Sequence, residues 1–266
     1  MFHVRLHHGV VTALATLLVC LSSWVNASET CDDCYVSDKG AFKYVLYNEL
    51  PASVIPAIHQ TLSNNTPRLL ADFKLAAMPS TTVRVWKSGG DYLAAQKDAL
   101  GVQFPGSTGY VFKNELRLLY TEGQTAQTAL HEFVHLVTLK VNPAFANNPR
   151  WLWEAIAIYE SEPVWYYANR LHLIRDRFDY LVNDLNANFN QSAAIYELGY
   201  TIGEYIDKKW GEEALLTLIK NNGDITKVTN MPMDALLKDW HAYVHATYFD
   251  APKSQYEMIL EKQTTR

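Results

Sequence analysis

The sequence contains little glycine, proline or cysteine and no surplus of positive charge. Glycine and proline account for 12 and 10 of its 266 residues, which excludes a fibrous repeat, and a hydrophobic content of 48% excludes a disordered chain. The formal net charge of −5 argues against non-specific nucleic-acid binding, because such binding requires a basic face. The length suits one globular domain with a proper core, or a small domain with an accessory part.

Residues 1–27 have the pattern of a secretory signal peptide. Arg5 lies near the start, an apolar stretch runs from Val10 to about Leu21, and Ala27 provides a small residue for cleavage. The apolar stretch is shorter than the roughly 20 residues that a membrane span needs, and no later stretch could span a membrane. We therefore expect an exported protein, periplasmic or secreted, without stable membrane insertion after signal removal; a permanent N-terminal anchor is the alternative.

The cysteines are placed for a small disulfide loop. Cys20 lies in the signal, and Cys31 and Cys34 remain in residues 28–40, which we expect to be an N-terminal tail of the mature chain. The two aspartates between the thiols would raise the pKa of both cysteines, which argues against a redox-active pair. A disulfide is the better interpretation for an exported protein, and a zinc knuckle would need two further ligands that are not evident nearby.

The rest of the chain predicts an α+β fold. Strand patterns and helical patterns alternate as far as Gly123, and the sequence has helical periodicity from there onward. We expect an N-terminal mixed α/β part with a small antiparallel-containing sheet, followed by a helical C-terminal lobe. The predicted catalytic domain covers 41–250, and a helical tail covers 251–266. The expected strands are 42–47, 82–86, 110–112 and 115–120. The expected helices include 51–77, interrupted near 64–67, then 91–100, and a helix that Thr125 or Thr128 caps and that runs to about Val141.

The expected strands 110–112 and 115–120 form a predicted hairpin about Lys113 and Asn114. The helix that follows it carries the sequence His131-Glu132-Phe133-Val134-His135. Histidines at i and i+4 project from one helix face, so both imidazoles can reach one zinc ion. Glu132, at the rim of that face, can accept a proton from water without being a ligand. Two ordinary histidines are the alternative interpretation, and we give that interpretation to His241 and His245, which have the same spacing but no glutamate between them.

Glu154 is the predicted third ligand. It follows His135 after 18 intervening residues, on a second helix that begins after Pro149. Bulky aromatic neighbours would bury its carboxylate, and a buried carboxylate requires a metal ion or an ion pair. The alternative is a structural glutamate paired with Arg150 or Arg170.

The combination of H-E-x-x-H, 18 residues and a glutamate within W-L-x-E-x-x-A resembles the gluzincin metallopeptidases. The spacing is that of the aminopeptidase N family, and the whole is most similar to the small bacterial peptidase MA-like proteins. The segment Tyr196-Glu197-Leu198-Gly199 resembles the Y-E-K-G segment of the aminopeptidase N family, and the likeness covers about Thr82 to Tyr248. The sequence departs from the pattern at Trp153, Ala155 and Leu198, and it lacks the G-x-M-E-N segment of exopeptidases.

The resemblance implies a zinc metallopeptidase that acts on peptide or protein substrates. His131, His135 and Glu154 would bind Zn²⁺, and Glu132 would be the general base. Tyr196 would donate a hydrogen bond to the oxyanion, with Tyr200 as its rival and a core aromatic role as the alternative. The strand at 115–120 could pair with an extended substrate. A catalytically silent zinc-binding protein and a zinc hydrolase of a non-peptide bond remain as alternatives.

Overall fold

The computed structural model describes residues 34–162, 175–188, 191–211 and 213–250. All of these belong to one compact unit, Asp33–Arg266. The predicted signal peptide, Cys31, Arg170 and the predicted helical tail at 251–266 lie outside the described residues. Cys34 is disulfide-bonded, and both other cysteines are outside the described part.

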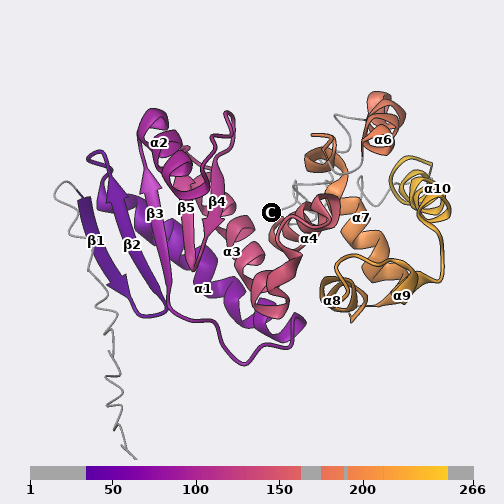
Figure 1. Cartoon of the computed structure of the whole chain (residues 1–266), viewed down its shortest axis with the longest axis horizontal. Coiled ribbons are helices and arrows are strands. Elements are labelled where there is room, and N and C mark those ends of the chain that lie inside the picture. Colours follow the sequence, from indigo (N-terminus) through magenta and orange to yellow (C-terminus); the bar gives the residue numbers. More distant parts are fainter. Residues whose placement is uncertain (1–33, 163–174, 189–190, 212, 251–266) are drawn as a thin grey trace, which may run out of the picture. The chain divides into compact units, whose positions relative to one another are not determined.

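The N-terminal part contains a five-stranded mixed sheet (Figure 1) with the order β1-β2-β3-β5-β4. The three inner strands are parallel to one another, and each edge strand is antiparallel to its neighbour. This arrangement confirms the α+β class with an antiparallel-containing sheet. The strands are β1 (Cys34–Lys39), β2 (Phe42–Tyr47), β3 (Thr81–Trp86), β4 (Gly109–Phe112) and β5 (Glu115–Leu119).

Strand β1 corrects the predicted tail at 28–40. Residues Cys34–Lys39 pair with β2 in a hairpin that turns at Gly40, where φ is +75°. The amide of Gly40 donates to Asp38 Oδ1 at 2.8 Å and closes the turn. The strand lies at an edge and is mostly exposed, so it lacks the alternation of apolar and polar residues by which half-buried strands are recognised.

The sheet separates two apolar layers. Side chains of β3 and β5 that point to one face, including Val83 and Leu116, belong to the main core together with the helices α1 (Ile55–Asp72) and α3 (Thr125–Val141). On the other face, Trp86 packs with Tyr92 of α2 (Gly89–Leu100) in a smaller cluster. Helix α3 is thereby fixed against the sheet that leads into it.

Helix α1 continues through the interruption predicted near 64–67. Pro67 lies inside it, where it lacks the amide that would bond the carbonyl of Ser63. Just before the proline, Asn65 donates from its side chain to the carbonyl of Thr61 at 2.8 Å, and Thr66 donates from its hydroxyl to that of Leu62 at 2.7 Å. Helix α1 is therefore continuous through Pro67, and these two side-chain hydrogen bonds lie in the turn before it.

The C-terminal part is helical, as predicted. Helix α4 (Arg150–Ser161) packs on α3 and, most extensively, on α7 (Ile195–Trp210). Gly203 permits the close approach of α7, since a Cβ there would lie 2.5 Å from Tyr159 Cβ on α4. The other helices that the structure describes are α6 (Phe178–Ala187), α8 (Glu213–Lys220), α9 (Thr226–Thr229) and α10 (Met233–Val244). Helix α10 continues into a π-helical segment, η4 (His245–Phe249). The described 3₁₀ turns are η1 (Ala52–Val54), η2 (Pro143–Phe145) and η3 (Arg175–Arg177).

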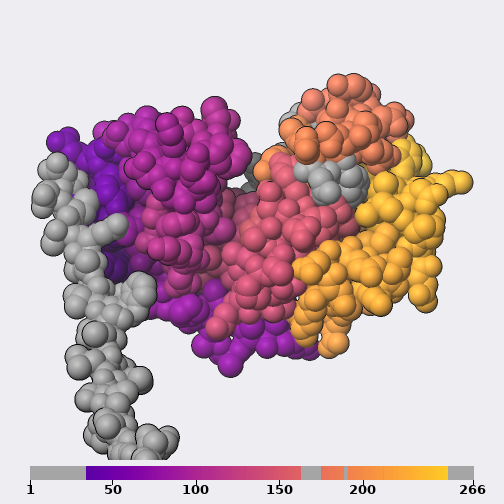
Figure 2. Space-filling model, viewed as in Figure 1, coloured from indigo at the N-terminus to yellow at the C-terminus, as the bar shows by residue number. Residues whose placement is uncertain are grey.

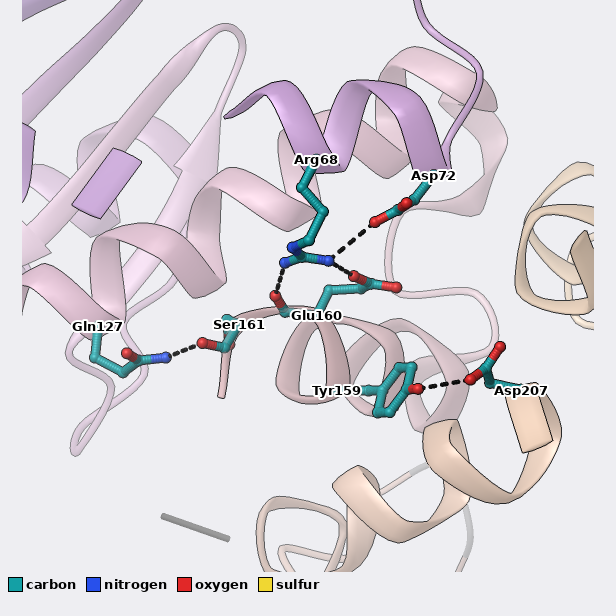
Figure 3. Close-up of polar contacts among 7 residues, drawn as sticks. All are labelled: Arg68, Asp72, Gln127, Tyr159, Glu160, Ser161 and Asp207. Carbon is teal, nitrogen blue, oxygen red and sulfur yellow. Dashed lines mark hydrogen bonds and ion pairs between the residues drawn. The ribbon is translucent and has the colours of Figure 1, made fainter. Parts of the chain in front are cut away.

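Polar contacts hold the C-terminal end of α4 to three other helices (Figure 3). Arg68 of α1 forms an ion pair with Glu160 and also donates to the carbonyl of that residue. Tyr159 donates to Asp207 of α7 at 2.8 Å, and Gln127 of α3 donates to the carbonyl of Ser161. Helix α4 is therefore anchored at the end that follows Glu154, the residue that it presents to α3. Among the helices that the structure describes, none is long and apolar enough to cross a membrane.

Candidate metal centre

Helix α3 presents His131, Glu132 and His135 from one buried segment. The imidazole centroids of the two histidines are 4.7 Å apart, with the rings nearly perpendicular. The helix is held by buried neighbours such as Phe133 and Val134, which pack in the main core. One turn of the helix thus sets the spacing of the two imidazoles, as the motif predicts.

Glu154 of α4 completes a cluster of three donor groups. Its Oε2 lies 3.3 Å from His131 Nε2 and 3.7 Å from His135 Nε2. Two donor atoms bound to one zinc ion at about 2.0–2.1 Å in tetrahedral geometry lie roughly 3.3 Å apart, so the observed separations fit a shared ion. Oε1 of the same carboxylate accepts a hydrogen bond from Tyr196 of α7, whereas Arg150 donates to the carbonyl of Ser192 at 3.3 Å.

A buried carboxylate oxygen also fits a metal ion. Glu154 Oε2 makes no hydrogen bond within the described part of the chain, although it lies close to both imidazoles. A buried carboxylate oxygen without a hydrogen bond is costly unless a cation satisfies it. The ring of His135 stacks on Trp153 at a centroid distance of 4.1 Å, nearly parallel, and this contact fixes the orientation of the imidazole. Trp153, at which the sequence departs from the gluzincin pattern, therefore has a structural role beside the predicted ligand Glu154.

Burial and mutual charge shift the pKa values of the cluster. Burial alone would raise the pKa of Glu154, but the neighbouring imidazoles of His131 and His135 lower it well below the ordinary value. Burial lowers the pKa of His135 to about 4, so this ring is neutral at neutral pH, which is the form that binds metals. Burial raises the pKa of Glu132 to about 7, against the opposing charge of His131. A carboxylate with a pKa near neutrality is suited to accept and return a proton.

Strand β4 passes directly over Glu132, a feature that the sequence analysis missed. A Cβ on Gly109 would lie 2.5 Å from Glu132 Oε1 and 2.8 Å from its Cγ, so a side chain at this position would displace the Glu132 carboxylate. The strand expected from the sequence begins at Tyr110 and so leaves Gly109 outside it. A glycine at the start of a strand was the available signal, because such glycines often mark a close approach of another group.

The predicted pairing of strand 115–120 with a substrate is wrong. Strand β5 (Glu115–Leu119) lies inside the sheet, with β3 bonded to one side and β4 to the other. Its backbone groups are therefore already paired. The free edge on this side of the sheet belongs to β4, which lies next to α3.

The structure places Tyr196, and not Tyr200, in contact with the cluster. The hydroxyl of Tyr196 donates to Glu154 Oε1 at 3.1 Å, while its ring remains 42% exposed. The guanidinium of Arg150 lies over this ring, 5.3 Å from its centroid. Tyr200 is 5% exposed and packs edge-on against Tyr159. Burial raises the pKa of Tyr196 above its ordinary value, as does the charge of Glu154, so its hydroxyl keeps its proton and can donate a hydrogen bond.

No protein-family model matches this chain, and no curated protein matches it significantly. The roles of these residues are therefore argued from the geometry and from the motif.

Proposed function

We propose that this chain is a zinc-dependent metallopeptidase of the gluzincin type. One observation carries the proposal: three donor groups converge from α3 and α4 within 4.8 Å of one another, and a buried glutamate adjoins them beneath a free strand edge. His131, His135 and Glu154 would bind the zinc ion. When bound, zinc supplies a Lewis acid and lowers the pKa of water toward about 7.

The protein side chains then have separate tasks. Glu132 accepts a proton from the attacking water and passes it to the departing amine. Tyr196, whose hydroxyl donates to Glu154 Oε1 in the structure, turns this hydrogen bond to the oxyanion that develops on the substrate carbonyl. Trp153 keeps the ring of His135 in place by stacking.

The edge of β4 offers a place for the substrate. An extended peptide can add to an exposed strand edge through backbone hydrogen bonds. Because Gly109 has no side chain, a peptide on this edge can lie close to the carboxylate of Glu132. The sequence lacks the G-x-M-E-N segment of exopeptidases, so we do not propose that the enzyme recognises the free amino terminus of its substrate.

We also propose that the enzyme is exported, since residues 1–27 have the signal pattern described above.

The test compares Glu132→Gln with wild-type protein in a peptide-library digestion, with and without a chelator. We expect the substitution to abolish cleavage while bound zinc, measured by elemental analysis, is retained. Glu122→Gln is the matched control, because Glu122 is an exposed residue in the turn before α3 and its substitution should leave cleavage unchanged.

The outcomes also separate the two alternative functions. Zinc in the wild-type protein without any hydrolysis would indicate a catalytically silent zinc-binding protein. Hydrolysis of small ester or amide substrates without cleavage of the peptide library would indicate a hydrolase of non-peptide bonds. Cleavage by Glu132→Gln at the wild-type rate would contradict the proposed mechanism.

A further inference from the structure

A second set of metal-ligand side chains lies on the helical lobe, apart from the candidate metal centre. His241 and His245, interpreted from the sequence as ordinary histidines, are brought together with Asp179 of α6. Their donor atoms all lie within 4.8 Å of one another. The two segments that supply them, α6 in orange and α10 with η4 in yellow, meet on the face of the molecule shown in Figure 2.

We propose that Asp179, His241 and His245 form a second binding site for a divalent transition metal such as zinc. The proposal goes beyond the proposed peptidase activity and does not depend on it. A metal ion bound here would join α6 to the end of α10.

The donor distances resemble those of the candidate metal centre. Asp179 Oδ1 lies 2.8 Å from His241 Nε2 and 3.4 Å from His245 Nε2. The imidazole centroids are 4.7 Å apart, the same spacing as between the two histidines of α3. A single carboxylate oxygen thus faces two Nε2 atoms in both clusters. Ligands of one zinc ion lie roughly 3.3 Å apart, so the 3.4 Å pair fits as it stands, whereas the 2.8 Å pair is a hydrogen bond in the structure and would lengthen by about 0.5 Å to admit the ion.

Neighbouring groups hold both imidazoles in position. The ring of Phe178 lies 5.6 Å from the His241 ring and 5.7 Å from the His245 ring, measured between centroids. Asp250 Oδ2 lies 3.9 Å from His245 Nδ1, an ion-pair distance longer than a hydrogen bond; a shift of less than about 1 Å would let this carboxylate accept from the second nitrogen, as carboxylates beside metal-binding histidines do.

The backbone at His245 departs from the α-helix. The π-helical segment begins at this residue, and the amide of Asp250 donates to the carbonyl of His245 at 2.9 Å. This turn brings the Asp250 carboxylate back to the imidazole. Single π turns are rare and occur frequently at functional sites.

The ligand types determine which metals the site would accept and what it would do. Imidazole ligands suit zinc, copper and nickel, whereas magnesium and calcium prefer oxygen ligands alone. Ala242 stands where the first cluster has Glu132, so the three residues of this cluster have no adjacent carboxylate in the position of that general base. We therefore assign this site a binding role. Because the side chain of Asp179 is 72% exposed, the ion should bind more weakly than at the buried centre.

The experiment measures zinc binding to the full chain by equilibrium dialysis and titration calorimetry. Asp179→Asn is compared with Asp176→Asn, which removes the same charge from an exposed neighbour outside the cluster. We expect Asp179→Asn to bind one zinc ion fewer than Asp176→Asn, or to weaken the second dissociation constant by about 10-fold or more. Equal zinc binding by the two variants would overturn the proposal.

A second pair of variants separates this site from the candidate metal centre. In a His131→Ala background, the exposed site should still bind zinc, and the addition of His245→Ala should remove that binding. His245 is partly exposed, so its loss should leave the fold intact, which circular dichroism would verify. Failure of the proposed peptidase activity would not affect this result. Zinc binding that persists without both His245 and Asp179, or that is matched by magnesium, would refute the inference.

Discussion

At Gly109 the absence of a side chain lets strand β4 pass within contact of the Glu132 carboxylate. A methyl group at this position would meet Glu132 Oε1 at 2.5 Å, and one of the two groups would have to move. The carboxylate that is the general base in the proposed mechanism is therefore positioned by a residue that has no side chain.

We expect Gly109→Ala to lower kcat/KM by about 100-fold, because a displacement of about 1 Å at a catalytic group can have that effect. The amount of bound zinc should not change, since Gly109 is not one of the three predicted zinc ligands. Gly89→Ala is the control, as a Cβ there meets nothing within 4 Å. Wild-type kinetics for Gly109→Ala would contradict the role of this contact.

Tyr196 is the tyrosine that reaches the cluster, so its hydroxyl carries a separate prediction. Tyr196→Phe should lower kcat by about 10²–10³ with little change in KM, the effect of removing one oxyanion donor. The exposed Tyr180 provides the control Tyr180→Phe, which should leave steady-state kinetics unchanged. A loss of kcat in Tyr200→Phe but not in Tyr196→Phe would reverse the assignment.

The sequence predicted some of these residues and missed others for a physical reason. His131, Glu132 and His135 share one helical turn, so the 3.6-residue period alone brings them together. Glu154 was found from its spacing and its aromatic neighbours. Gly109 and Asp179 depend on contacts with residues distant in the chain, and no local periodicity encodes such contacts.

At the scale of elements, helices α4 and α7 pack closely because glycines replace larger residues along α7. A Cβ on Gly203 would lie 2.5 Å from Tyr159 Cβ, and one on Gly199 would lie 3.2 Å from Ala155 Cα. Helix α4 carries Glu154 and α7 carries Tyr196, so this packing sets the distance between the predicted ligand and the predicted oxyanion donor.

Whether Gly203→Ala stabilises or destabilises the protein tests this packing. In a solvent-exposed helix, a glycine-to-alanine change stabilises by roughly 0.5–1 kcal/mol. At Gly203 we expect destabilisation of about 1–3 kcal/mol instead, because the added methyl overpacks the interface. Urea denaturation of Gly203→Ala, with Gly89→Ala for comparison, measures the difference; a stabilised Gly203→Ala would contradict the close approach.

Sequence patterns predicted where helices and strands occur better than they predicted which of these elements lie side by side. The predicted helix, capped by Thr125 or Thr128 and running to about Val141, corresponds to α3 (Thr125–Val141), although its N-cap is Gln124. The hairpin around Lys113 was also confirmed by the pairing of β4 with β5. The order of strands was not predictable in this way, because apolar alternation shows which face of a strand is buried and not which strand lies beside it. That is why the substrate edge was assigned to the wrong strand.

At the scale of the whole molecule, buried carboxylates make stability depend on pH. Glu204 of α7 accepts a hydrogen bond from Tyr248 at 2.5 Å in a buried position. Burial raises the pKa of Glu204 above its ordinary value of 4.5, despite the hydrogen bond from Tyr248 that favours the charged form. The folded protein therefore holds this proton to a higher pH than the unfolded chain does.

The sign of the effect follows from proton linkage. Between the ordinary pKa and the raised folded pKa, the folded state binds more protons, so the free energy of unfolding falls as pH rises. Glu204→Gln has no charge to bury, so we expect its stability relative to wild type to increase as pH rises from about 4 to about 7. Urea denaturation across this range measures the trend, with the exposed Glu122→Gln as control. A difference that does not vary with pH would contradict it.

The two histidine clusters close loops of very different length. His135 and Glu154 are 19 positions apart in the sequence, whereas Asp179 and His241 are 62 positions apart. Since each doubling of a loop adds only about 0.6 kcal/mol to its closure entropy, the longer loop corresponds to about 1 kcal/mol more. An ion at the exposed cluster would thus act as a cross-link across much of the helical lobe, and its contribution to folding would exceed what its solvent-exposed ligands suggest.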